Sequence, residues 1–176
     1  MFDLPLHPIA VHFPIVLGIA LPFVGLLLWW AIRKEYFGQK AWVFVPALAL
    51  AYSLSAVVAV ELGEKDEDKA EKVVSEKVIH EHEEAGEVIP WIAGTLALIS
   101  LAGFVPRKSH SIRFSVAILC LAAIVPLIDA GHTGGKLVYR YGAANAHLPV
   151  EYKALVSSGK FYVQNFKRED EKEHED

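Results

Sequence analysis

Four long apolar runs restrict the fold of this sequence more than any other feature. They cover residues 8–32, 41–60, 85–105 and 114–130. Each run has roughly the 20 apolar residues that a helix needs to cross a bilayer core about 30 Å thick. The charged residues are concentrated elsewhere, mainly in 64–87 and 167–176. The pattern predicts an all-α protein, a four-helix transmembrane bundle in the lipid bilayer.

Composition excludes several classes of function. The formal net charge of −4, without a basic stripe, gives no reason to expect binding of nucleic acid. The single cysteine, Cys120, forms no intrachain disulfide, and the absence of a CxxCH motif excludes covalent c-type haem. We find no P-loop, dinucleotide fingerprint or nucleophile beside a base. An electron-transfer or anchoring subunit is therefore a better expectation than a catalyst acting by itself.

The basic residues predict the orientation in the membrane. Those beside the first and third connections are Arg33, Lys34, Lys40, Arg107, Lys108 and Arg113. Since short cytoplasmic loops are enriched in lysine and arginine, we expect both connections in the cytoplasm and both termini on the non-cytoplasmic side of the inner (cytoplasmic) membrane. An aromatic belt is expected at the inner interface. Its members would be Trp29, Trp30, Tyr36 and Trp42.

The acidic segment between the second and third runs is predicted to be helical. It has no glycine or proline between Glu64 and Ala85 and is rich in Glu, Lys and Ala, so we expect a charged helical extension between helices 2 and 3 on the outer side. One stripe of it is expected to pack inward. The stripe consists of Ala70, Val74, Val78, His82 and Ala85. Gly131 is expected to close the fourth span. We expect residues 1–142 to form the four-helix transmembrane domain and residues 143–176 to form an extramembrane tail.

Five of the eight histidines converge on the outer layer of this topology. They are His7, His12, His80, His82 and His132. Ionisable side chains at membrane depth indicate function, and imidazoles on facing helices commonly hold haem iron. His82 lies on the inward stripe, whereas His80, about 200° away around the helix, lies on the charged side. His82 is therefore the better candidate ligand.

The leading functional prediction is a b-type haem, cytochrome b-like electron-transfer protein or subunit of a redox complex. His12 and His82 are the first pair of ligands and His7 and His132 the second, and both one site and two sites remain open. His7 aligns with a seam of small residues that includes Gly18 and Gly25.

The glycine-rich stretch 131–142 is informative as well. Dense glycines either end a helix or let a ring or another backbone come close. Because His132 lies in this stretch, Gly134 and Gly135 are assigned to the cofactor site.

Two alternatives use the same residues differently. A non-haem site for a divalent metal, iron or zinc, would use histidine and glutamate of the outer layer, as with His80 and Glu84 at i,i+4. In a cofactor-free structural subunit, the acidic outer helix would dock a basic partner such as a cytochrome.

Three motifs resemble a known family. They are Leu6-His7-Pro8-Ile9-Ala10-Val11-His12-Phe13-Pro14-Ile15, the pair His82-Glu83, and Gly134-Gly135-Lys136-Leu137-Val138-Tyr139. Over about residues 4–142 the chain resembles the bacterial predicted membrane proteins called domain of unknown function 2231. The resemblance implies a four-helix membrane domain, sometimes joined to or beside c-type cytochrome modules, which makes a c-type cytochrome or a larger redox complex an expected partner.

Overall fold

The fold is a bundle of four long helical segments without strands, in the part of the chain that the structure describes. This computed structural model describes residues 5–105, 109–149 and 152–153. Four of its helices are long and apolar enough to cross a membrane, which confirms the predicted fold class. They are His7–Arg33, Gln39–Ala70, Glu76–Phe104 and His110–Arg140.

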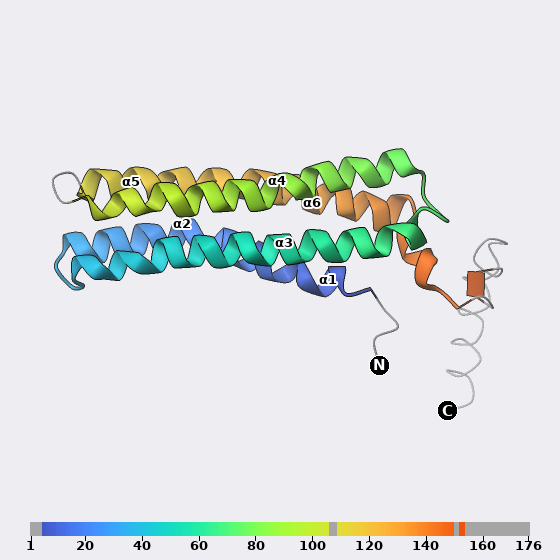
Figure 1. The fold of residues 1–176 in the computed structure, drawn as a ribbon, viewed down its shortest axis with the longest axis horizontal. Helices are drawn as coiled ribbons and strands as arrows, with labels where there is room; N and C mark the ends of the chain where they lie inside the picture. The colour runs from blue at the N-terminus through green and yellow to red at the C-terminus, as the bar shows by residue number, and fades with distance from the viewer. Residues whose placement is uncertain (1–4, 106–108, 150–151, 154–176) are drawn as a thin grey trace, which may run out of the picture.

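Each span is built from shorter elements in sequence. The first combines α1 (His7–Ala10) and α2 (His12–Arg33), the second η1 (Gln39–Val43) and α3 (Phe44–Ala70), the third α4 (Glu76–Ser100) and η2 (Leu101–Phe104). The fourth combines α5 (Ser109–Leu119), η4 (Cys120–Ala123), α6 (Ile124–Gly135) and η5 (Lys136–Arg140), and the short η6 (Ala143–His147) follows. The spans run alongside one another in alternating directions (Figure 1).

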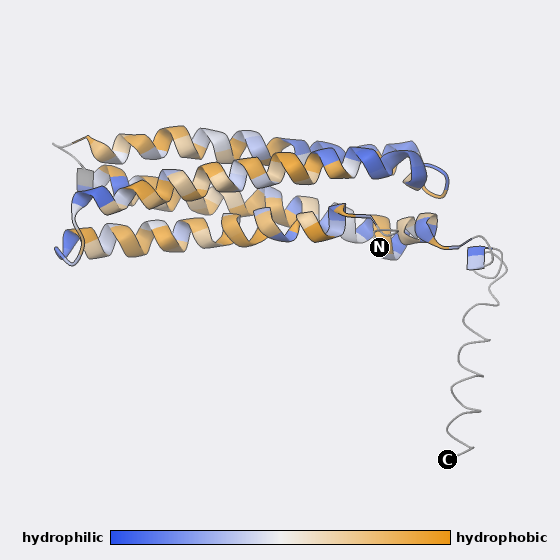
Figure 2. Cartoon of the chain, turned by 60° about the horizontal axis from the view of Figure 1, so that its bottom comes forward, coloured by the Kyte–Doolittle hydropathy of each residue, from blue (hydrophilic) through white to orange (hydrophobic). Residues whose placement is uncertain are grey.

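The two ends of the bundle differ in chemistry. We call the end that carries His7, His82 and the α3–α4 connection the histidine end, and the end that carries Arg33 and Arg113 the basic end. The second span has 32 residues, so it is about 48 Å long and exceeds the bilayer core of about 30 Å by more than half. The excess is hydrophilic and lies at the histidine end (Figure 2).

The predicted extension at this end is helical, but it is not one helix. α3 ends at Ala70 and α4 begins at Glu76, with a turn over residues 71–75. Val74 in the turn is buried against Ile79 and Leu137, and Ala70 and Val78 pack around them. The chain must reverse here to bring α4 back along α3, and burial of Val74 stabilises the reversal without glycine or proline.

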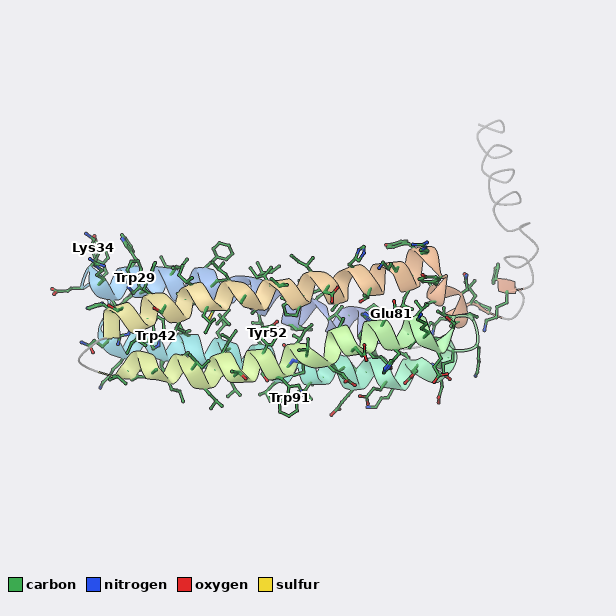
Figure 3. The ribbon with its side chains drawn as sticks, turned by 90° about the horizontal axis from the view of Figure 1, so that it is seen from above. Trp29, Lys34, Trp42, Tyr52, Glu81 and Trp91 are labelled. Atoms are coloured by element: carbon green, nitrogen blue, oxygen red, sulfur yellow. The ribbon has the colours of Figure 1, made fainter. Side chains whose placement is uncertain are left out.

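Small residues on the first span allow the neighbouring spans to pack closely against it. A β-carbon at Gly18 would lie 2.6 Å from Leu127 Cδ1, and one at Gly25 would lie 3.2 Å from the β-carbon of Ala117. The predicted seam of small residues on the first span is therefore confirmed. Large apolar side chains cover the outside instead. Trp91, 79% exposed, points away from the bundle, as expected of a lipid-facing surface (Figure 3).

At the basic end, Trp42 does not belong to an interfacial belt. Its side chain is fully buried, and its Nε1 donates a hydrogen bond to the Ser100 carbonyl at 2.9 Å. The reason is that Gly103 has no side chain, so the indole lies directly on its backbone. Trp30 and Tyr36 are exposed, and Trp29 is half-buried. Arg107 and Lys108 lie outside the described residues.

Arg113 is buried beside this tryptophan. Its guanidinium carbon lies 5.7 Å from the centre of the Trp42 ring, and its Nε donates to the Gly103 carbonyl at 2.9 Å. Neither Nη atom has a hydrogen-bond partner among the described residues. The aromatic face and one carbonyl therefore hold this positive charge.

The fourth span continues past Gly131, contrary to the sequence prediction. α6 runs to Gly135, a π-helical turn extends it to Arg140, and Gly142 then adopts a left-handed conformation with φ of 73°. The glycine that ends a helix is commonly the one in this conformation, so Gly142 has that role. Most of the predicted tail, 150–151 and 154–176, lies outside the described residues.

Candidate functional site: a histidine pair

Two imidazoles from separate spans meet at the histidine end. His7 is the first residue of α1, and His82 lies in the second turn of α4. Their ring centres are 5.9 Å apart, and the ring planes are at 86° to each other, so the edge of one ring lies against the face of the other. His82 precedes the end of its span at Phe104 by 22 residues, about 33 Å, which corresponds to the thickness of a bilayer core.

The second span orients His7. Its Nδ1 lies 2.8 Å from the carbonyl oxygen of Ala59. A carbonyl only accepts hydrogen bonds, so Nδ1 carries the proton of the neutral ring and Nε2 carries a lone pair. One turn along α3, a β-carbon at Gly63 would lie 3.1 Å from the same nitrogen. Ala59 and Gly63 thus provide an acceptor and the space in which the ring lies.

The fourth span orients His82. Its Nδ1 lies 3.0 Å from the hydroxyl oxygen of Thr133, which itself lies 3.1 Å from the carbonyls of Asp129 and Ala130. The hydroxyl donates to one of these carbonyls and accepts from Nδ1 of His82. With its proton on Nδ1, His82 also has a lone pair on Nε2.

Gly134 makes room for this ring. A β-carbon at Gly134 would lie 3.0 Å from Cε1 of His82, whereas one at Gly135 or Gly131 would meet nothing within 4 Å. Gly131, Gly134 and Gly135 therefore lie within the helix and do not end it, and Gly134 allows a ring to come close. Gly134 is part of the histidine site, and Gly135 has no contact with it.

The other histidines are placed differently from the sequence predictions. His12 and His132 are exposed, and neither has a ring contact with another histidine in the described parts of the chain. The structure therefore brings together one member of each predicted pair, His7 and His82, rather than His12 with His82 or His7 with His132. His80 lies outward as predicted, with Nε2 3.2 Å from the Glu84 carboxylate.

His80 and Glu84, the pair on which the predicted divalent-metal site rests, lie 3.2 Å apart, and a metal ion there stays a prediction. Over residues 5–105, 109–149 and 152–153, no three side chains of His, Cys, Asp or Glu come close enough to hold a metal ion together. The pair of His7 and His82 thus offers two protein donors. Asp129 is exposed, and only its backbone carbonyl takes part, through Thr133.

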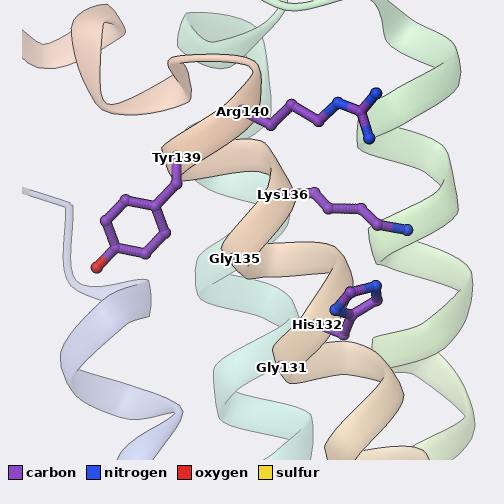
Figure 4. A pocket seen from close by; sticks show the side chains of 6 residues that line it. All are labelled: Gly131, His132, Gly135, Lys136, Tyr139 and Arg140. Atoms are coloured by element: carbon purple, nitrogen blue, oxygen red, sulfur yellow. The ribbon is translucent and has the colours of Figure 1, made fainter.

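His132 lines an open groove of about 400 Å³ on the other side of its helix. The lining residues are Gly131, His132, Gly135, Lys136, Tyr139 and Arg140. Lys136 and Arg140 extend to the same side as His132, and Tyr139 extends to the opposite side (Figure 4).

Sequence reasoning missed the residues that orient the pair. Thr133 stands between a histidine and two glycines, and its hydroxyl was a usable signal. Ala59 and Gly63 are small residues four apart on the second span, but nothing in their spacing indicates that His7 lies on them.

This fold and site define a small polytopic membrane protein with a pair of histidines at one end of its bundle. A family model described as Predicted membrane protein (DUF2231) matches residues 3–147, and the chain belongs to this family. The resemblance found in the sequence is thereby confirmed. No curated protein and no solved structure matches the chain.

Proposed function

We propose that the chain is a membrane-embedded metal-binding protein in which Nε2 of His7 and Nε2 of His82 bind one transition-metal ion. The approach of the two imidazoles, with each Nδ1 beside a hydrogen-bond acceptor, carries the proposal. A histidine that binds a metal almost always donates its other ring N–H to such an acceptor, which fixes the tautomer and the orientation of the ring. Imidazole nitrogen suits iron and zinc.

The packing favours an individual ion over haem. The edge of one ring touches the face of the other, so a porphyrin between them would require the helices to move apart, whereas a single ion needs far less space. Haem b remains the second candidate, because two imidazoles from separate spans are also the ligand set of a bis-histidine haem. It would use His7 and His82, and its iron would transfer electrons.

Two protein ligands leave coordination positions for water or a partner's group, which suits a redox subunit better than a closed structural site.

The basic end is proposed to face the cytoplasm, because Arg33, Lys34, Lys40 and Arg113 gather there. The pair would then face the outside of an inner membrane. Exposed carboxylates on the α3–α4 hairpin, including Glu64, would attract a basic partner such as a c-type cytochrome.

Metal loading of the full chain tests the proposal. The detergent-purified protein is analysed for metals and haem as isolated, stripped with a chelator, and titrated with Zn²⁺ and with Fe²⁺. We expect one ion per chain, with the ring resonances of His7 and His82 shifted and those of His12 and His132 unchanged. A Soret band together with extractable haem would mean that His7 and His82 bind haem rather than a single ion. Failure to bind any metal, with unchanged resonances of the pair, would refute both candidates.

Filling the space at Gly134 is expected to weaken the site without removing a ligand. In Gly134→Val the new side chain would displace the His82 ring from Thr133, and loss of such an orienting contact typically lowers metal affinity 10- to 100-fold. The same Zn²⁺ titration measures the change. Gly131→Ala is the matched control, because its β-carbon meets nothing within 4 Å. Equal affinities of the two variants would contradict the geometry of the site.

A further inference from the structure

The groove beside His132 is formed by two parallel rows of residues on the fourth span. His132, Lys136 and Arg140 are spaced four apart and form a row that contains two basic side chains. Gly131, Gly135 and Tyr139 form the neighbouring row, and neither glycine has an atom within 4 Å of the place where a β-carbon would lie. A bare strip of backbone therefore runs beside a row of cations (Figure 4).

The two cations have no acidic partner in the described residues. The ion pairs found there join Lys69 with Asp66, and His80 with Glu83 and Glu84. Asp129, exposed one turn below Thr133, forms none with Lys136 or Arg140. The Arg140 guanidinium carbon lies 5.8 Å from the centre of the Tyr141 ring, a contact that leaves its N–H groups available. Lysine and arginine placed together in this way favour a phosphate group.

The groove continues an apolar surface that faces lipid. Leu121, Val125 and Ile128 are 41%, 68% and 66% exposed, and they lie at intervals of three and four residues on the line that leads to His132. Tyr139, 91% exposed, lies at the far end of the glycine row, where an amphipathic ring suits the membrane–water interface. A molecule that fits this surface has an apolar chain at one end and an anionic group at the other.

We propose that this groove binds one anionic phospholipid of the surrounding leaflet. Lys136 and Arg140 would hold the phosphate, the glycine row would accommodate the glycerol region, and Val125 and Ile128 would contact an acyl chain. The apolar continuation favours a lipid over free phosphate, because free phosphate gains nothing from Val125 or Ile128. The site lies on the opposite side of the helix from the Thr133–His82 contact and does not depend on the proposed metal function.

Native mass spectrometry of the full chain in detergent tests the proposal. Dioleoylphosphatidylglycerol is titrated against the wild type, against Lys136→Gln/Arg140→Gln, and against the control Lys65→Gln/Lys72→Gln. The control removes two exposed lysines near the same end of the bundle. We expect the groove variant to bind the lipid roughly 10- to 30-fold more weakly, the effect of two charges at a membrane surface. The control is expected to bind like the wild type.

Three further measurements identify the source of the phosphate and separate binding from folding. Dioleoylphosphatidylcholine, with no net charge, is expected to bind at least about tenfold more weakly than dioleoylphosphatidylglycerol. Millimolar inorganic phosphate is not expected to displace bound dioleoylphosphatidylglycerol. Gly135→Leu, which fills the strip but keeps both cations, is expected to weaken binding while the thermal unfolding midpoint is retained. Equal loss in the control, equal binding of both lipids, or displacement by inorganic phosphate would overturn the proposal.

Discussion

Replacing His82 with alanine is expected to lower the affinity for Zn²⁺ at least about 100-fold. The variant removes one of two protein donors, and loss of an outer-shell contact alone typically costs 10- to 100-fold. His80→Ala is the matched control, because His80 lies two residues away on the same helix but on its exposed face, 66% accessible. The control is expected to bind Zn²⁺ like the wild type. Isothermal titration of metal-free protein measures both.

His82→Gln separates ligation from packing. Glutamine fills similar space and keeps a hydrogen-bonding group near Thr133, but its amide is a poor donor to transition metals. We therefore expect it to lose metal affinity like the alanine variant while keeping the thermal stability of the wild type. His7→Ala is expected to match His82→Ala, and His12→Ala to match the wild type. Wild-type affinity in His82→Gln, or a loss in His12→Ala equal to that in His7→Ala, would show that the pair is not the site.

The largest expected effect on stability comes from Gly103→Leu at the basic end. Any side chain at Gly103 would overlap the Trp42 indole, which is fully buried and donates to the Ser100 carbonyl. Accommodating it would push Trp42 out, break that hydrogen bond and disturb Arg113, so we expect a loss of about 3 kcal/mol or more in the free energy of unfolding. Circular dichroism in detergent during heating measures the shift.

Gly38→Leu is the matched control for this substitution. Gly38 is exposed, has a backbone φ of −67°, and offers open space around its β-carbon position. The same side chain is therefore expected to change stability by less than about 0.5 kcal/mol there. Similar melting of the Gly103→Leu variant and the wild type would mean that Trp42 is not buried as described.

The four spans were predictable because the bilayer imposes a length and a composition on every crossing helix. Inward placement of His82 and the close packing at Gly18 and Gly25 followed from periodicity along one helix. The turn at residues 71–75 was not predictable from local signals, because it depends on burial of Val74 against Ile79 and Leu137. Burial of Trp42 depends on Gly103, 61 residues later in the chain, and no local pattern relates the two.

The site was predictable only in part for a similar reason. Periodicity gives the face of a helix on which a histidine lies, but it does not give the rotation or the axial shift of one helix against another. The sequence places both His7 and His12 at the level of His82 in the bundle. The contact of His7 with Ala59 and Gly63 makes His7 the one that pairs with His82. His132 was at the right depth as well, but its neighbour Thr133 faces the pair.

Burial of Arg113 at the basic end affects the histidine pair at the other end of the bundle. The Arg113 guanidinium is fully buried beside the Trp42 indole, and its Nε donates to the Gly103 carbonyl, so sliding of its span along the bundle would break both contacts. Both Arg113 and Thr133 belong to the fourth span, which is helical from His110 to Arg140. Thr133 lies 20 residues after Arg113 in this span, about 30 Å along the helix. Burial of Arg113 at the basic end therefore also fixes the position, along the bundle axis, of the Thr133 hydroxyl that orients His82 at the histidine end.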